Sequence, residues 1–263
     1  FPYTTLFRSK VYGSIKITRI LRDNGYPKLS VNRVSRLMKQ LGIRSITIRK
    51  FKNYRNKQNE HSELKNLVNQ NFSAQKPNQI WLSDITYIHT VKNGWTYLAS
   101  VLDVCTRKIV GYSYGRKMDR SLVISALTKA WQNQNYPNNV ILHSDRGSQY
   151  TSSEYIAAAE RMGFRLSYSK KGCPFDNAPM ESFHSVLKKE EVYLKHYSSF
   201  YEANIRLFDY INGFYNRNRI HLAINFLSPI QFENSLFYSY FFSPFCVQII
   251  DYGPVQTSKT LAR

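Results

Sequence analysis

Three acidic residues occupy positions where a carboxylate could take part in chemistry. Asp84 lies inside an apolar run, residues 80–87, where an ionised side chain costs desolvation energy unless it is paired or metal-bound. Asp145 directly follows a short apolar run, and ligand sites in open α/β sheets gather at the carboxyl ends of strands. Glu181 lies near the start of a predicted helix, where the helix dipole favours an acid. Taken singly, each also fits an ordinary role as an edge-strand, turn or first-turn residue.

The elements that must position these acids alternate between strands and helices. Hydrophobic periodicity and turn signals such as Asn93-Gly94 predict strands at residues 80–89, 95–102, 108–114, 139–143 and 164–169. Helical periodicity predicts helices at residues 121–134, 152–162, 178–192 and 200–215. Three strands followed by alternating helices and strands indicate an α/β fold, with a mixed sheet flanked by helices.

A strongly basic segment precedes these elements. The chain has 37 Lys and Arg residues against 17 Asp and Glu, which gives a net charge of +20. Residues 10–60 contain fourteen of the basic residues and two of the acids, so more than half of the excess charge lies there. A chain this basic binds polyanions, and nucleic acid is the first candidate, ahead of an anionic membrane surface.

Two short helices are expected in this basic segment. Ser14 is predicted to cap a helix over residues 15–22, which Asn24-Gly25 ends, and Ser30 a helix over residues 31–41, which Gly42 ends. The second helix has apolar residues on one face and Arg33, Arg36 and Lys39 on the other. The pattern indicates a small helix-turn-helix-like unit that binds DNA, and a solvated helical hairpin is the alternative.

Three motifs surround the acids: Trp-x-x-Asp-Ile-Thr-Tyr (81–87), His-Ser-Asp-Arg-Gly-Ser-Gln-Tyr (143–150) and Asp-Asn-Ala-x-x-Glu-Ser-Phe (176–183). In this order, and with thirty-five residues between Asp145 and Glu181, they resemble the integrase-core transposases of bacterial insertion sequences. The resemblance runs from about residue 75 to residue 232. Residues 10–51, with Leu37-Met38-Lys39-Gln40-Leu41-Gly42, are similar to the helix-turn-helix segment upstream in such proteins, here cut short at its start.

The resemblance implies a ribonuclease-H-like core in which Asp84, Asp145 and Glu181 hold two divalent metal ions, Mg²⁺ or Mn²⁺. Asp84 would bridge both ions, with Asp145 on one and Glu181 on the other, for DNA 3′-end cleavage and strand transfer. Hard cations of this kind take oxygen ligands, which explains the carboxylates. We therefore expect the three carboxylates within a few ångströms of one another, although like-charge repulsion can turn Glu181 outward without metal.

Other residues around the acids have candidate supporting roles. Lys188 lies two helical turns after Glu181 and is expected to hold a DNA phosphate, since the family often has a basic residue there. Gln149 and Tyr150 either contact DNA or cap the loop after Asp145. Asn177 either orients Glu181 or caps its helix, and the cap is favoured.

The domain organisation follows from these assignments. Residues 1–9 resemble one reading frame of a sequencing adapter, so we expect them to be non-native and the true N-terminus to be missing. Residues 10–55 are the truncated helix-turn-helix-like segment, residues 56–75 a linker and residues 76–235 the catalytic core. Residues 236–263 form a tail of unknown role.

Double-stranded DNA, both element ends and target, is the expected partner. The chain is also expected to self-associate on DNA and to act with an upstream-frame DNA-binding partner or fusion. No apolar run reaches the ~18 residues that a membrane span requires, and three scattered cysteines do not suggest disulfides. A bacterial cytoplasm, at the nucleoid, is the expected compartment.

Two alternatives stay open: a non-catalytic DNA-binding regulator or decayed element product, and an endonuclease on the same fold without strand transfer.

Overall fold

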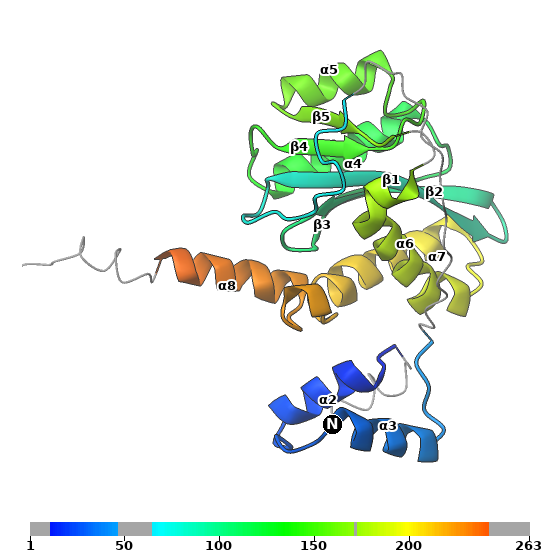
Figure 1. The fold of residues 1–263 in the computed structure, drawn as a ribbon. Helices are drawn as coiled ribbons and strands as arrows, with labels where there is room; N and C mark the ends of the chain where they lie inside the picture. The colour runs from blue at the N-terminus through cyan, green and yellow to red at the C-terminus, as the bar shows by residue number, and fades with distance from the viewer. Residues whose placement is uncertain (1–10, 47–64, 171–172, 242–263) are drawn as a thin grey trace, which may run out of the picture.

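The computed structural model describes residues 11–46, 65–170 and 173–241, and it confirms the predicted mixed α/β architecture. Five strands form one sheet in the order β3-β2-β1-β4-β5 (Figure 1). The strands are β1 (Ile80–Thr90), β2 (Gly94–Asp103), β3 (Ile109–Gly115), β4 (Ile141–Ser144) and β5 (Arg165–Tyr168). β1 pairs antiparallel with β2 and parallel with β4. The predicted adapter residues 1–9 lie outside the described residues.

Alternating side chains of β1 supply the two cores on the two faces of the sheet. Trp81 packs into the core under α4 (Arg120–Asn133) and α5 (Ser153–Arg161). Leu82 packs into the core under α6 (Ala178–Glu190), α7 (Phe200–Phe208) and the π-helical turn (Asp209–Tyr215) that follows α7. Because successive strand residues face opposite sides, Asp84 lies on the same face as Leu82, the face that α6 covers.

The basic segment forms the expected pair of helices, α2 (Ser14–Asp23) and α3 (Val31–Gln40). Ser30 caps α3 as predicted, because its hydroxyl accepts the Arg33 N–H at 3.2 Å. Ser14 does not cap α2: it is the first helical residue, and the cap position belongs to Gly13, which has no side chain to bond. Gly25 and Gly42 follow the two helices with φ values of 96° and 67°, a left-handed conformation that glycine tolerates.

The helical pair is docked against the core. The buried hydroxyl of Tyr12 accepts the Ile220 N–H at 3.1 Å and lies 3.5 Å from the Asn218 carbonyl oxygen, to which it donates. Ile220 and Phe214 pack on the small apolar cluster of the helical pair. Figure 1 shows α2 and α3 below the layer of α6, α7 and α8.

The described part of the expected linker has no helix or strand, yet it is fixed to the sheet edge. The Lys65 carbonyl oxygen accepts the Tyr168 N–H at 3.0 Å, and the Ser167 hydroxyl accepts the Leu67 N–H at 2.9 Å. Val68 is buried. This stretch therefore extends the core along β5, and residues 56–64 of the expected linker lie outside the described residues.

A helix that we did not expect, α8 (Pro229–Phe241), closes the described chain. It runs without a break across residue 235, where the core was expected to end and the tail to begin. In Figure 1 it projects away from the sheet. Within the described ranges, no helix is both long and apolar enough to cross a membrane.

A buried ion pair joins α6 to the chain that follows the π-helical turn. The Arg219 guanidinium donates to both carboxylate oxygens of Glu190, at 2.9 and 2.8 Å, and both side chains are almost inaccessible. The Tyr210 hydroxyl donates to Glu190 as well, at 2.8 Å. Both charges are thus paired and hydrogen-bonded, the condition under which a buried pair is tolerated.

We expect Glu190→Gln to lower the free energy of unfolding by about 3–5 kcal/mol, because it leaves the Arg219 charge buried without a partner. Tyr210→Phe removes one hydrogen bond and keeps the pair, so it should cost only about 1 kcal/mol. Urea unfolding followed by circular dichroism measures both. Equal losses in the two variants would contradict a buried charge pair.

Candidate active site

Asp84 is the central acid of the candidate site. Its side chain is 24% exposed and projects from β1 toward α6. One carboxylate oxygen accepts the N–H of Ile85 at 2.8 Å, and the other lies 3.4 Å from Nδ1 of His184 on α6. A helix side chain thus reaches the carboxylate from across the core.

Asp145 lies beside Asp84 because β1 and β4 are parallel neighbours. Ser83 is paired with Ser144, so the residue after each serine falls at the same level of the sheet. The Asp145 carboxylate is accessible and accepts the Gly147 N–H at 2.9 Å. Desolvation by the surrounding protein raises the pKa of Asp145, and the negative charge of Asp84 raises it further.

Glu181 approaches from the first turn of α6. It precedes His184 by three residues, which places both side chains on the face of the helix directed at β1. Partial desolvation raises the pKa of Glu181, and the charge of Asp84 adds to this rise. Asp84 is thus the common electrostatic neighbour of Asp145 and Glu181.

The expected close convergence of the carboxylates is only partly present. Across the part of the chain that the structure describes, no three His, Cys, Asp or Glu side chains are grouped as a metal-binding set. The three acids lie in one region, and the charge of Asp84 acts on the other two. They do not form a preformed metal-binding set. Repulsion between like charges is the physical reason for this spacing.

Ser83, the neighbour of Asp84, is held from both sides. Its hydroxyl lies 3.1 Å from the Tyr150 hydroxyl, and its carbonyl oxygen lies 3.5 Å from Nδ2 of Asn177, which donates to it. Tyr150 is 1% exposed, so its side chain has no surface for contact with DNA. This burial favours its other candidate role, a structural one in the loop after Asp145. Asn177 makes no side-chain cap, so the favoured interpretation was wrong: it ties the start of α6 to β1.

A second anchor, Asp176, fixes the chain just before α6. Its buried carboxylate accepts hydrogen bonds from the side chains of Asn66 (2.9 Å) and Gln70 (2.7 Å) and from the Lys170 N–H (2.8 Å). These donors come from the stretch along β5 and from the end of β5. The position of Glu181 therefore depends on contacts with segments more than a hundred residues upstream.

The residues expected to contact DNA are placed in three regions. Lys188 is half-buried on the α6 face that carries Glu181. The amide of Gln149 donates to the Met118 carbonyl oxygen at 3.2 Å, which fixes the loop after β4. Arg33, Arg36 and Lys39 are exposed on α3, on the side opposite its buried Val34.

Two histidines near the acids have different environments. Sequence reasoning missed the contact of His184 with Asp84, although its i,i+3 spacing from Glu181 was the available signal. His143 is buried between the hydroxyls of Ser167 and Ser169, at 2.8 and 3.1 Å. Burial lowers the pKa of His143, so a neutral ring fills a structural position behind the site.

Comparisons with known proteins agree with this architecture. Two models of the Integrase core domain match residues 74–174 and 181–237, and an HTH-like domain model matches residues 6–51. The transposase for insertion sequence element IS904 of Lactococcus lactis subsp. lactis (strain IL1403) is 40% identical, over 84% of this chain and 87% of that protein. Transposase InsF for insertion sequence IS3A of Escherichia coli (strain K12) is also 40% identical, over 85% and 77%.

Among solved structures, a chain of the simian T-cell lymphotropic virus intasome in complex with PP2A regulatory subunit B56 gamma shares the fold. The TM-score is 0.52 at 18% identity, and the match covers 79% of this chain and 66% of that chain. The sheet order, the flanking helices and these matches define an integrase-type catalytic core. The chain belongs to the transposases of insertion sequences, a family of DNA-cleaving and strand-transferring enzymes.

We expect Asp145→Asn to raise the melting temperature in EDTA at neutral pH by about 2 °C or less, because it removes a partly desolvated charge that Asp84 also repels. The pKa of Asp145 is raised in the folded state, so ionisation of this carboxyl group opposes folding at a pH above its ordinary pKa. The rise in melting temperature of Asp145→Asn over the parent should therefore shrink as the pH falls toward 4. Asn keeps the oxygen that accepts the Gly147 N–H.

Thermal unfolding monitored by circular dichroism gives the measurement, with Asp119→Asn as the control. Hydrogen bonds, chiefly from Ser121, lower the pKa of Asp119, so its neutralisation should give no gain. Added Mg²⁺ should stabilise the parent chain more than Asp145→Asn. An Asp145→Asn protein that melts at a lower temperature than the parent in EDTA would contradict the inference that the charge of Asp145 destabilises the folded state.

Proposed function

We propose that Asp84, Asp145 and Glu181 are the catalytic acids of this transposase, acting in DNA 3′-end cleavage and strand transfer. The observation that supports them most directly is their placement: the parallel pairing of β1 and β4 sets Asp145 beside Asp84, and Glu181 lies in the first turn of α6, the helix that covers Asp84. Partial desolvation raises the pKa of both Asp145 and Glu181, and the charge of Asp84 adds to the rise. Acids in a shared, partly desolvated site are typical of functional centres. The family assignment supports this proposal over a regulator without catalysis, and no observation favours an endonuclease without joining.

The donor set fits a hard divalent cation, Mg²⁺ or Mn²⁺, because it consists of carboxylate oxygens on three separate elements. When bound, a pair of such ions makes an attacking hydroxyl nucleophilic and stabilises the leaving oxygen. Asp84 and Asp145 would hold the ions from adjacent strands, with Glu181 closing the site from α6. His184 would keep the Asp84 carboxylate oriented through its 3.4 Å contact.

The reaction needs no covalent bond between protein and DNA. Water attacks a phosphodiester at the element end, the bond to the 3′ oxygen breaks, and that oxygen takes a proton. The new 3′-hydroxyl then attacks a target phosphodiester and gives up its proton as the target 3′ oxygen leaves. Lys188, on the face of Glu181, would hold the phosphate next to the reacting one, and the loop with Gln149 would border it.

The helical pair is proposed as the sequence-independent anchor on double-stranded DNA. Arg33, Arg36 and Lys39 project from α3 without acidic neighbours in the first turn of that helix. Element ends, target DNA, a second copy of the chain and an upstream-frame DNA-binding partner are the proposed assembly. A DNA substrate would place this assembly at a bacterial nucleoid.

Glu181→Gln should abolish both 3′-end cleavage and strand joining in Mg²⁺, because an amide binds a hard cation poorly. DNA affinity should stay near that of the parent, since the basic segment is untouched. Gel assays with labelled element ends separate cut from joined products. Mn²⁺ should recover a little activity.

Glu160→Gln is the matched control, because Glu160 is an exposed helix acid on α5, on the other face of the sheet. It should cleave and join like the parent. A Glu181→Gln protein with parental activity would show that Glu181 is an ordinary helix acid.

Replacing Arg33, Arg36 and Lys39 together by Ala should flatten the dependence of log affinity on log salt by up to about 3, at ~0.9 per lost phosphate contact. Fluorescence anisotropy of a labelled duplex over a salt series measures this slope. Unchanged affinity and slope would place the DNA anchor elsewhere in the chain.

A further inference from the structure

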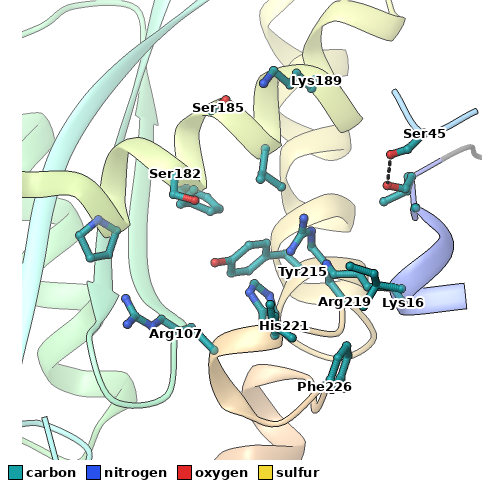
Figure 2. Close-up of a pocket in the computed structure, with 18 of the residues that line it drawn as sticks. Lys16, Ser45, Arg107, Ser182, Ser185, Lys189, Tyr215, Arg219, His221 and Phe226 are labelled. Carbon is teal, nitrogen blue, oxygen red and sulfur yellow. Dashed lines mark hydrogen bonds between the residues drawn. The ribbon is translucent and has the colours of Figure 1, made fainter. Parts of the chain in front are cut away.

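A groove of about 830 Å³ separates the helical pair from the catalytic core. Its walls are the start of α2, one face of α6 and the chain after the π-helical turn (Figure 2). Four basic side chains line it: Lys16, Arg107, Lys189 and Arg219. No acidic residue is among its lining residues in the described part of the chain.

Three of these four cations have no acidic partner. Glu190 neutralises Arg219, whereas Lys16, Arg107 and Lys189 form no ion pair with any described residue. Burial, reinforced by the charge of Arg219, lowers the pKa of Lys16 to about 8. Glu190 acts on Lys16, and Asp103 on Arg107, only through space and without an ion pair, so the groove keeps an excess of positive charge that favours an anionic ligand.

Two neutral features of the groove add hydrogen-bonding capacity for an anion. Nε2 of His221 is buried without a hydrogen-bond partner among the described residues. The first intrahelical bond of α2 runs from the Ile17 N–H to the Gly13 carbonyl oxygen, so the three preceding N–H groups, at Ser14, Ile15 and Lys16, have no acceptor in the helix. Uncapped N–H groups at a helix start are suited to phosphate oxygens.

The groove and the candidate active site share one helix, α6. At about 100° per residue, Ser182, Ser185 and Lys189 form a stripe next to the one that carries Glu181. In Figure 2 the labelled side chains of α6 line the wall of the groove opposite Lys16 and Ser45. One extended polyanion could therefore contact both the acids and the groove.

We propose that this groove binds the phosphate backbone of the DNA substrate and connects the strand at the acidic site with the helical pair. The proposal rests on the proposed function for the identity of the polyanion. The volume lies in the range of roughly 300–1,000 Å³ that encloses whole ligands, so it can hold more than one phosphate group. Lys16 and Lys189 contact it from opposite walls, and Arg107 from the floor near β2.

The test compares two double charge reversals in the full chain. Lys16→Glu with Lys189→Glu alters the groove, and Lys129→Glu with Arg161→Glu is the matched control on exposed positions of α4 and α5. Anisotropy of a labelled duplex of arbitrary sequence is measured in EDTA over a salt series, so that the result does not depend on catalysis. Thermal unfolding checks that both variants are folded.

The groove variant should lose about tenfold or more in affinity and about 2 units of salt slope, at ~0.9 per phosphate contact, and the control less than about 0.5. Equal losses in the two variants would overturn the proposal. Loss of binding with the groove variant, together with full activity of Glu181→Gln, would refute the catalytic assignment and leave the groove standing.

A second measurement on the unaltered chain does not depend on folding of a variant. Acetylation of lysines by an amine-reactive ester is followed by mass spectrometry with and without the same duplex. DNA should block acetylation of Lys16 and Lys189 and leave Lys129 unchanged. Equal labelling with and without DNA, or protection of both groove lysines before DNA is added, would overturn the proposal.

Discussion

The site depends on holding like charges near one another around Asp84. This carboxylate lies on a strand between buried Ser83 and half-buried Ile85. Desolvation raises the pKa of Asp145 and Glu181, and the charge of Asp84 adds to both rises. Two unit charges 4 Å apart repel by on the order of 1–4 kcal/mol, depending on how much water screens them. The two cores and the buried ion pair stabilise the sheet and α6, and this stabilisation offsets the repulsion between the acids.

The supporting contacts act on the backbone next to each acid. Ser83 is held by Tyr150 and Asn177, and Asp176 fixes the start of α6 through three hydrogen bonds. Each contact joins segments distant in sequence. The arrangement leaves the carboxylates in one region but not grouped as a metal-binding set among the described residues.

The docking of the helical pair creates a surface that neither part has alone. Tyr12 bonds to the chain before α8, and the space beside this contact is lined by basic side chains, of which Arg219 is paired with Glu190. A basic helix on its own binds DNA non-specifically, whereas a basic groove that shares α6 with the acids also sets the path of the strand. Recognition and chemistry are thus connected through one helix.

The sequence by itself determined the strands and most of the helices, and it selected the three acids as candidates. Period-two runs placed β1, β2 and β3, the Ser30 cap placed α3, and three ordered motifs selected Asp84, Asp145 and Glu181. These features are local: a few neighbouring residues fix a strand, a cap or a turn, and a motif is read directly along the chain.

Only the tertiary structure decided the contacts between elements. Asn177 bonds to β1 instead of capping α6, Tyr150 is buried, and His184 reaches Asp84, because packing brings partners together that no local pattern encodes. The sequence alone also did not reveal α8 or the contacts of the stretch along β5, whose polar composition predicted a linker. The hydrogen-bond partners of this stretch lie about a hundred residues away in sequence. Its composition correctly indicated a segment without a helix or strand, but it could not reveal these contacts.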